Sequence, residues 1–462
     1  MTGARELLEL TAAIAADYLD TIETRPVFPH VTPEELRAAL GGPLPDEPLD
    51  AKAVVTELVA AAEPGVVAVG SGRYFGFVIG GELPAALAAD WLTSVWDQNA
   101  GLYAAGPSAS VVEQVTRDWL VDLLGLPRDA SIGFVTGTQM AHVTGLAAAR
   151  FHVLDAVGWD VGRNGLRGAP RVRILVGAKR HVTIDRALRL LGLGAPTVVD
   201  ADGQGRMLAP ALLEALGADS GPTIVCAQAG EVNTGAFDPL DEIGAAAHAA
   251  GAWLHVDGAF GIWAAVSPKL RGLVAGIEHA DSWTTDAHKW LNVPYDSGIV
   301  FCAHPESHRA AMTVHAEYLV QDAGARVVRD EVDWVPEFSR RARGFAVYAS
   351  LRSLGRSGLV ELVERSCAAA TQFATGIVEL GADVLNDVVL NQVLFRFEDD
   401  DRTDAVLARV QDSGRIWLSG TTWDGHKAIR LSVSNWQTGG GQIELALDAF
   451  REAVYAGQAP AR

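Results

Sequence analysis

The chain has 462 residues, 49% of them hydrophobic, and a formal net charge of −20 at pH 7. This length and apolar content suffice for a large core and more than one domain, and the negative charge argues against a nucleic-acid or anionic-membrane partner. No apolar run reaches membrane-spanning length, and the N-terminus lacks the cationic-then-apolar order of a signal peptide. The three cysteines lack paired spacing, which predicts reduced, buried thiols. We therefore expect a cytoplasmic protein.

The first residues are predicted to form a helix followed by an extended arm. Residues 5–22 carry an apolar stripe at helical spacing, whereas residues 24–48 are rich in proline and turn residues. Such an arm is a poor core former, so we expect it to pack on another surface, either a second subunit or its own domain. Residues 73–80 are aromatic and punctuated by glycine, which fits either a core strand or a substrate-facing loop.

Two helices are expected next, over residues 84–98 and 111–124. Ser110 precedes the second helix and Glu113 follows three residues later, which is the spacing of a capping box. This structural role explains both side chains without any chemistry.

An anion site is predicted where an apolar run starting at Ile132 meets Thr136-Gly-Thr-Gln139 and a long helix begins. Glycine and hydroxyl groups at a helix N-terminus bind anions because free backbone amides and the helix dipole point at the ligand. The same pattern also fits an ordinary capped helix, so on these residues alone both interpretations stay open.

From residue 171 to residue 302, apolar strands alternate with helices. This alternation predicts an α/β fold with a mostly parallel sheet covered on both faces. Ligands of such folds bind at the carboxyl ends of the strands. His181 follows one predicted strand, Asp257 ends another and Lys289 lies beyond a third, so we expect these side chains to converge.

The types of these residues suit one cofactor. Lysine is normally exposed, but a lysine that condenses with a carbonyl as a Schiff base carries no free ammonium ion to solvate. A carboxylate at the end of a buried strand, such as Asp257 before Gly258 and Ala259, suits a flat ring with a protonated nitrogen. A lysine Schiff base and such a carboxylate are what pyridoxal 5′-phosphate (PLP) requires.

A metal site is the remote alternative. His255 and Asp257, and likewise Asp286 and His288, form two histidine/aspartate pairs at metal-ligand spacing. A metallohydrolase would use them, but it would leave Lys289 and the neighbouring glycines unexplained. We therefore expect no metal.

The C-terminal part is predicted to hold a long irregular stretch and a second domain. Residues 318–341 lack periodicity, which is typical of a lid, and Glu331 and Asp333 read as a solvated face. Residues 345–462 mix helices and strands. Arg430 is a charge inside a strand-like run, so it needs an anionic partner.

These motifs resemble the fold-type I PLP enzymes, and specifically the group II amino-acid decarboxylases that include the aromatic-L-amino-acid and glutamate decarboxylases. The most specific pieces are His255-Val-Asp-Gly-Ala259 and Asp286-Ala-His-Lys-Trp290. The resemblance implies the fold-type I α/β architecture, with a seven-stranded, mostly parallel sheet in a large domain over residues 85–344. It also implies a small C-terminal α+β domain over residues 345–462, and a homodimer in which residues 1–84 pack on the partner subunit.

The resemblance also implies residue roles. Lys289 would hold PLP as a Schiff base, Asp257 would pair with the pyridine nitrogen and keep a depressed pKa, and His181 and Ala259 would cover the two ring faces. The phosphate would lie against Gly137, Thr138, Gln139 and His288 with Asp286 beside it, and the substrate against Phe75, Tyr103 and Arg430. The implied activity is that of a PLP-dependent carboxy-lyase acting on an L-amino acid.

The chain departs from this family at three places. Residues 319–343 contain no tyrosine, whereas the family's mobile loop supplies one that protonates the substrate Cα. Asp286 replaces a neutral amide near the phosphate, where an acid is unfavourable unless backbone amides hold it. Ser71-Gly72 stands where the family has His-Pro before the aromatic loop, and Val78-Ile79 thins the aromatic clamp, so an aromatic substrate is only the default. An aldolase, a transaminase or an aldehyde-forming enzyme stays open as the alternative.

Overall fold

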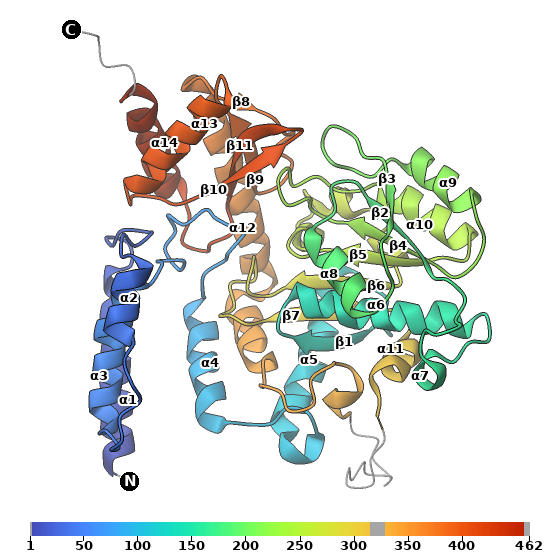
Figure 1. Ribbon diagram of the computed structural model, residues 1–462, viewed down its shortest axis with the longest axis horizontal. Coiled ribbons are helices and arrows are strands. Elements are labelled where there is room, and N and C mark those ends of the chain that lie inside the picture. Colours follow the sequence, from blue (N-terminus) through green and yellow to red (C-terminus); the bar gives the residue numbers. More distant parts are fainter. Residues whose placement is uncertain (1, 315–328, 457–462) are drawn as a thin grey trace.

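The N-terminal segment is helical and lies along one side of the molecule (Figure 1). The computed structural model describes residues 2–314 and 329–456. The segment holds α1 (Thr2–Thr21), α2 (Pro33–Leu40) and α3 (Ala51–Ala62). The helix expected over residues 5–22 is thus confirmed.

The proline-rich stretch is not wholly extended as predicted, because it contains α2. Thr32 and Glu35 form a capping box at the start of this helix, and Pro33 occupies its first position. A proline there loses no hydrogen bond, since the first amides of a helix have no intrahelical partner.

The larger of two sheets has seven strands in the order β1-β7-β6-β5-β4-β2-β3. Neighbouring strands are parallel except in the two pairs that involve β7. The predicted mostly parallel, seven-stranded sheet is therefore confirmed. The strands are β1 (Ser131–Val135), β2 (Arg173–Gly177), β3 (Thr197–Val199), β4 (Thr223–Gln228), β5 (Trp253–Asp257), β6 (Ser282–Asp286) and β7 (Gly298–Cys302).

Helices cover both faces of this sheet (Figure 1). Ile224 and Val225 are neighbours on β4 but belong to different apolar clusters, one on each face, because side chains alternate along a strand. Across the described ranges, no helix is long and apolar enough to cross a membrane. The helices before the C-terminal region are α4 (Pro84–Trp96), α5 (Pro107–Leu124), α6 (Thr138–Asp155), α7 (Val161–Asn164), α8 (Val182–Leu190), α9 (Ala209–Gly217), α10 (Leu240–Ala249) and α11 (Pro305–Met312).

The C-terminal region has a four-stranded antiparallel sheet of order β10-β11-β9-β8. A long helix, α12, joins the two sheets: Val347 packs in the apolar cluster of the larger sheet and Phe373 in that of the smaller one. This helix has a kink at Gly355, where φ is 60°. The elements are α12 (Gly344–Glu379), β8 (Asp383–Val384), β9 (Gln392–Arg396), α13 (Asp400–Asp412), β10 (Ser419–Trp423), β11 (His426–Ser432) and α14 (Gly440–Tyr455).

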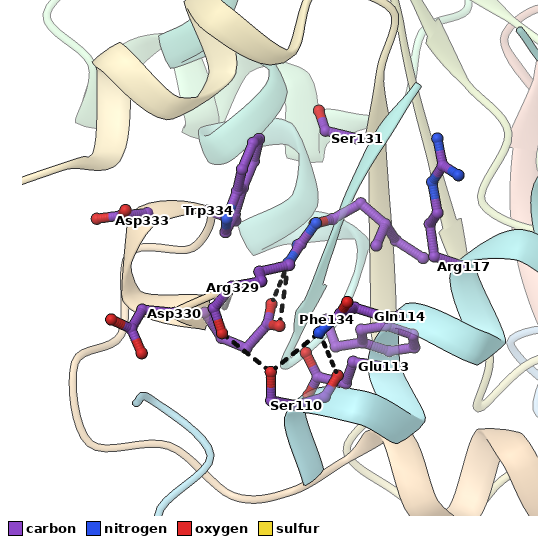
Figure 2. Close-up of polar contacts among 12 residues, drawn as sticks. Ser110, Glu113, Gln114, Arg117, Ser131, Phe134, Arg329, Asp330, Asp333 and Trp334 are labelled. Atoms are coloured by element: carbon purple, nitrogen blue, oxygen red, sulfur yellow. Dashed lines mark hydrogen bonds and ion pairs between the residues drawn. The ribbon is translucent and has the colours of Figure 1, made fainter. Parts of the chain in front are cut away.

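A group of charged side chains packs against the edge strand β1 (Figure 2). We call Glu113, Arg329, Glu331 and Arg340 the arginine cluster. Because α5 begins at Pro107, Glu113 lies inside this helix, and the predicted capping box is wrong. Glu113 Oε1 instead lies 2.8 Å from Arg340 Nη1, and both side chains are almost fully buried.

The prediction of a solvated face at Glu331 and Asp333 is also wrong. These residues bound the short 3₁₀ helix Glu331–Asp333 and are only 1% and 3% exposed. Arg329 lies 2.9 Å from Glu331, and Arg309 lies 2.8 Å from Asp333, so each carboxylate gains a cationic partner that offsets its burial. Residues 318–328 of the predicted lid lie outside the described part of the chain.

Candidate active site

A cavity of about 270 Å³ opens at the carboxyl ends of β4, β5 and β6, beside the N-termini of α6 and α8. Parallel sheets bind ligands at this edge. Each residue predicted to contact the cofactor lines the cavity, so the structure brings them together. The lining residues are Gly137, Thr138, Gln139, His181, Thr183, Gln228, Gly230, Val232, Asp257, Ala259, Phe260, Asp286, His288 and Lys289.

Lys289 lies in the turn after β6, with its side chain 20% exposed. Its Nζ is 3.1 Å from Asp286 Oδ2 and 6.0 Å from the centroid of the Phe260 ring. Gly80 packs directly on this turn, because a Cβ at that position would lie 1.7 Å from the Lys289 carbonyl oxygen. The amine is therefore held inside the cavity by a carboxylate rather than by bulk water.

Asp257 ends β5 and is 5% exposed. The backbone N–H of Ala259 donates to its Oδ1 at 3.1 Å, and His142 Nε2 lies 3.4 Å from its Oδ2. Burial alone would raise the pKa of Asp257, but the facing His142, with His181 and Lys289, lowers it below its ordinary value. The predicted depressed pKa is thus confirmed.

The N-terminus of α6 points at the same cavity. Gly137 is its N-cap, and a Cβ there would lie 3.2 Å from His288. Gly298 on β7 approaches so closely that a Cβ would lie 2.3 Å from the Gly137 backbone, so this strand needs glycine beside the turn. Within the described residues, the buried hydroxyl of Thr138 has no hydrogen-bond partner. This site therefore keeps an unused donor beside the helix dipole.

Asp286 is held by a backbone amide, as an acid near a phosphate site requires. The backbone N–H of Thr138 donates to its Oδ1 at 2.6 Å, and His288 Nε2 lies 3.4 Å from the same oxygen. Burial opposes ionisation, but Lys289 and His288 lower the pKa of Asp286 overall. One backbone amide of the α6 N-terminus, that of Thr138, is thus already bonded to Asp286.

His181 is the N-cap of α8, so it has a structural role in addition to the predicted one at the cofactor ring. Its Nδ1 lies 2.8 Å from Thr183 Oγ1, and its ring lines the cavity. Burial lowers the pKa of His181, so the ring is neutral near pH 7.

The residues predicted to bind substrate do not line this cavity. Phe75 is fully buried in the apolar cluster of the smaller sheet, so it is a core residue rather than a pocket residue. Tyr103 begins a short 3₁₀ helix near Asp330. Arg430 donates from Nη1 to the carbonyl oxygen of Val232 at 3.2 Å, and Val232 lines the cavity.

The anionic partner expected for Arg430 is not found as a direct ion pair among the described residues. Its Nε is buried without a hydrogen-bond partner, and Glu231 raises its pKa only from a distance against the lowering by burial. Arg430 therefore keeps a free donor next to the cavity wall.

The sequence analysis assigned no role to His142, although this residue follows the predicted anion motif by only three positions. His142 is fully buried one turn into α6, with Nδ1 2.9 Å from His255 Nε2. The feature that could have indicated a role for His142 was a histidine among small residues on a helix next to buried strands. Its partners are far away in sequence, so the pattern alone did not reveal them.

The metallohydrolase alternative finds no ligand set. Within residues 2–314 and 329–456, no group of three or more histidine, cysteine or acidic side chains is arranged to hold a metal ion. His255 contacts His142 and Ser282, whereas His288 faces Asp286 at the α6 N-terminus. The two histidines that were candidate metal ligands, His255 and His288, therefore bond to different partners.

Comparison with known proteins agrees with this site. The chain is 28% identical to the aromatic-L-amino-acid decarboxylase of Sus scrofa over 94% of its length and 93% of the relative. It is 26% identical to the phenylacetaldehyde synthase of Arabidopsis thaliana, covering 93% and 91%. The crystal structure of Oryza sativa TDC with PLP and tryptamine has the same fold, with a TM-score of 0.92, 24% identity and 99% of each chain covered.

A family model, the pyridoxal-dependent decarboxylase conserved domain, matches residues 33–398. This match covers well over half of the chain and includes the lysine turn, the end of β5 and the α6 N-terminus. The chain therefore belongs to the pyridoxal-dependent decarboxylase family, and it is a PLP-dependent enzyme of the carbon–carbon lyase class.

Proposed function

We propose that the enzyme removes the α-carboxylate of an L-amino acid, with PLP held by Lys289. One observation carries the proposal: the amine of Lys289 and the carboxylate of Asp257 line one cavity with the N-terminus of α6. An aldehyde, a ring nitrogen and a phosphate need these three partners. When bound, PLP supplies an electron sink for the bond that breaks at the substrate Cα.

The residues of this cavity fit the cofactor's phosphate. The Thr138 hydroxyl is a buried donor without a partner in the described chain, and Gly137 leaves the space that a side chain would fill. We assign the phosphate to Thr138, Gln139, His288 and the free amides of α6. Asp286 binds the Thr138 amide and faces Lys289, which keeps its negative charge neutralised.

Asp257 has the role of holding a proton on the pyridine nitrogen. Its depressed pKa keeps the carboxylate ionised at neutral pH, and an ionised partner favours the protonated ring. We assign His181 to one face of the ring and Ala259 to the other, because both line the cavity beside Asp257.

Arg430 is the group we assign to the substrate carboxylate. Only a bond perpendicular to the cofactor ring overlaps its π system, so contacts to the carboxylate select which bond breaks. The unused Nε of Arg430 supplies such a contact. Tyr74, on which the charge of Arg430 acts, stacks on Trp417 with ring centroids 5.1 Å apart, and Phe77 lies 5.2 Å from Trp417. An aromatic group near Arg430 favours a substrate with an apolar or aromatic side chain.

The chain is also proposed to act as a homodimer. A cavity of about 720 Å³ opens between α1, α3 and α4, with a mostly apolar lining. Exposed apolar side chains surround it, including Leu58 (55% exposed) and Trp91 (40%). Clustered exposed apolar surface marks an interaction site, and a second copy of the N-terminal segment would cover it. Sedimentation should give a dimer mass, and a monomer would contradict this.

The spectrum and the products test the function together. The purified enzyme with PLP should absorb near the visible edge, lose this band with borohydride, and release an amine and carbon dioxide from at least one L-amino acid. Lys289→Ala should lose both the band and the turnover. Lys269→Ala is the matched control, because Lys269 pairs with Glu364 outside the cavity. Full activity of Lys289→Ala would overturn the proposal.

An aldehyde-forming reaction is the second candidate. Residues 319–343 contain no tyrosine to protonate the substrate Cα, and a phenylacetaldehyde synthase is among the relatives. Product analysis separates the candidates: amine in a one-to-one ratio to carbon dioxide supports decarboxylation alone, whereas an aldehyde or keto acid without amine supports the second.

A further inference from the structure

A line of buried polar side chains ends at Asp257, on the sheet side of the cavity. Trp253 Nε1 lies 2.9 Å from Ser282 Oγ, which lies 2.7 Å from His255 Nδ1. His255 Nε2 lies 2.9 Å from His142 Nδ1. His142 Nε2 lies 3.4 Å from Asp257 Oδ2, but this contact lacks hydrogen-bond geometry, so the nitrogen has no hydrogen-bond partner among the described residues. None of the five residues is more than 5% exposed. We call these five residues the histidine relay.

Trp253, at one end of the relay, determines which atom donates in each of the following hydrogen bonds. An indole N–H only donates, so Ser282 Oγ accepts from Trp253. In the described part of the chain, the Ser282 hydroxyl has hydrogen-bond partners only in Trp253 and His255, so it donates its proton to His255 Nδ1. His255 then carries its proton on Nε2 and donates to His142 Nδ1. His142 in turn carries its proton on Nε2, which faces Asp257.

The opposite direction leaves a buried group unsatisfied. If His142 were a cation, its Nδ1–H would donate to His255 Nε2, and His255 Nδ1–H would then donate to Ser282. The Ser282 hydroxyl proton would have no acceptor, and a buried unpaired donor is costly. Burial lowers the pKa of His255 to about 3, which agrees with a neutral ring.

The packing of α6 makes room for this arrangement. Gly145 lies nearly one helical turn after His142 on the same face, and a Cβ there would lie 3.0 Å from His255 Cε1. A larger residue at position 145 would push the His255 ring away from His142. The backbone of Ala259 holds the other oxygen of Asp257 at 3.1 Å, so the carboxylate is fixed from two elements.

We propose that His142 and His255 are positioning residues: two neutral imidazoles, with tautomers set by Trp253 and Ser282, that aim one N–H at Asp257 and so orient its carboxylate toward the cofactor ring. The inference rests on the proposed function of Asp257 but adds partners that act through it. The relay holds the carboxylate without placing a buried positive charge beside the ring nitrogen.

The first test measures cofactor affinity by equilibrium dialysis, with decarboxylation as a second readout. His142→Leu removes the N–H that faces Asp257 and should weaken PLP binding about 10-fold, the low end of what a polar contact to a buried charged group contributes. His142→Gln keeps an N–H at similar reach and should recover most of this loss. His308→Gln is the matched control, because His308 is equally buried but bonds to Ser131 and the Trp334 carbonyl.

The second test is ¹⁵N NMR of the histidine-labelled enzyme without cofactor. The signals that disappear in His142→Leu and His255→Gln should be those of neutral rings protonated at Nε2, and Ser282→Ala should shift the His255 signal toward a tautomer mixture. Imidazolium signals, or rings protonated at Nδ1, would overturn the relay. Wild-type PLP affinity in His142→Leu would overturn the positioning role.

The two proposals fail separately. If PLP does not bond to Lys289 in the unaltered enzyme, the proposed function is wrong, while the NMR result still reports on the relay. If PLP binds and amine forms, but His142→Leu and His308→Gln behave alike, only the relay is wrong.

Discussion

Asp257 and Glu113 are both buried carboxylates with shifted pKa values, yet their surroundings differ in kind. Asp257 faces His142 on one side and a cavity on the other, and its pKa is lowered. Glu113 faces Arg340, which also donates to the carbonyls of Ala100 and Phe134 at 2.8 and 2.7 Å. Burial raises the pKa of Glu113 to about 8, against the pull of that guanidinium.

The contrast teaches that a shifted pKa does not by itself mark an active site. In the arginine cluster the cations are engaged with carboxylates and carbonyls of the same chain, so this group joins α5, β1 and the segment after residue 328 (Figure 2). Beside Lys289, donors such as the Thr138 hydroxyl remain unused and face a cavity. Within the described ranges, the arginine cluster also holds a buried donor without a hydrogen-bond partner, Arg340 Nε, but this atom does not line the cavity. A binding site is therefore marked by unused donors that line a cavity, and not by unused donors alone.

The largest expected effect separates the two carboxylates directly. Asp257→Asn removes the charge that keeps the ring nitrogen protonated and should lower kcat by about 1,000-fold or more, in the range known for preorganised electrostatic groups. Glu113→Gln should leave kcat within a few-fold. Steady-state kinetics on folded, PLP-saturated enzyme decides this, and equal losses in both variants would erase the distinction.

Breaking the arginine cluster should act on stability instead. Arg340→Ala leaves Glu113 and two carbonyl groups without their buried partner and should lower the free energy of unfolding by about 3–5 kcal/mol. The paired replacement Glu113→Leu with Arg340→Met should recover much of this loss, because a buried ion pair is often replaceable by apolar side chains. Urea denaturation measures both, with turnover per folded molecule as the control.

Arg430→Met should raise KM for the amino acid about 10- to 100-fold, the worth of one hydrogen bond to a charged group. The loss should be smaller for an amine product used as an inhibitor, because it lacks the carboxylate. Arg396→Met is the control, since Arg396 pairs with Asp400 on the smaller sheet. An unchanged KM would show that Arg430 is structural.

The pH dependence of stability should have opposite signs in the two regions. His255 has a pKa near 3 in the folded chain instead of 6.5, so only the unfolded chain binds its proton between these values. Its stabilisation is present above pH 6.5 and is lost as the pH falls, by up to about 1.4 kcal/mol per pH unit.

Glu113 behaves inversely, because its pKa of about 8 lies above the ordinary 4.5. Its contribution is present below pH 4.5 and is lost as the pH rises through about 8. The free energy of unfolding of Glu113→Gln should therefore depend less on pH between pH 4.5 and about 8, and that of His255→Gln less between about pH 3 and 6.5. Parallel shifts in both variants would contradict these assignments.

Local pattern predicted much of the fold and part of the site. Strand-to-helix alternation gave the parallel sheet, and the end-of-strand positions of His181, Asp257 and Lys289 placed them around one cavity. These predictions succeed because side-chain periodicity and strand-end geometry are local properties. The same reasoning failed at Glu113, where a capping box and an interior ion pair share one sequence pattern.

The sequence by itself determined which chemistry the chain carries: a lysine, an acid and an anion-binding helix start in the order that PLP requires. Only the tertiary structure decided the partners of these groups. His142 meets Asp257 across 115 positions of chain (257 − 142), Phe75 turns into the core, and Arg430 keeps a free donor. Local sequence sets which face a side chain occupies, whereas long-range packing sets what it meets there, and no short pattern encodes that choice.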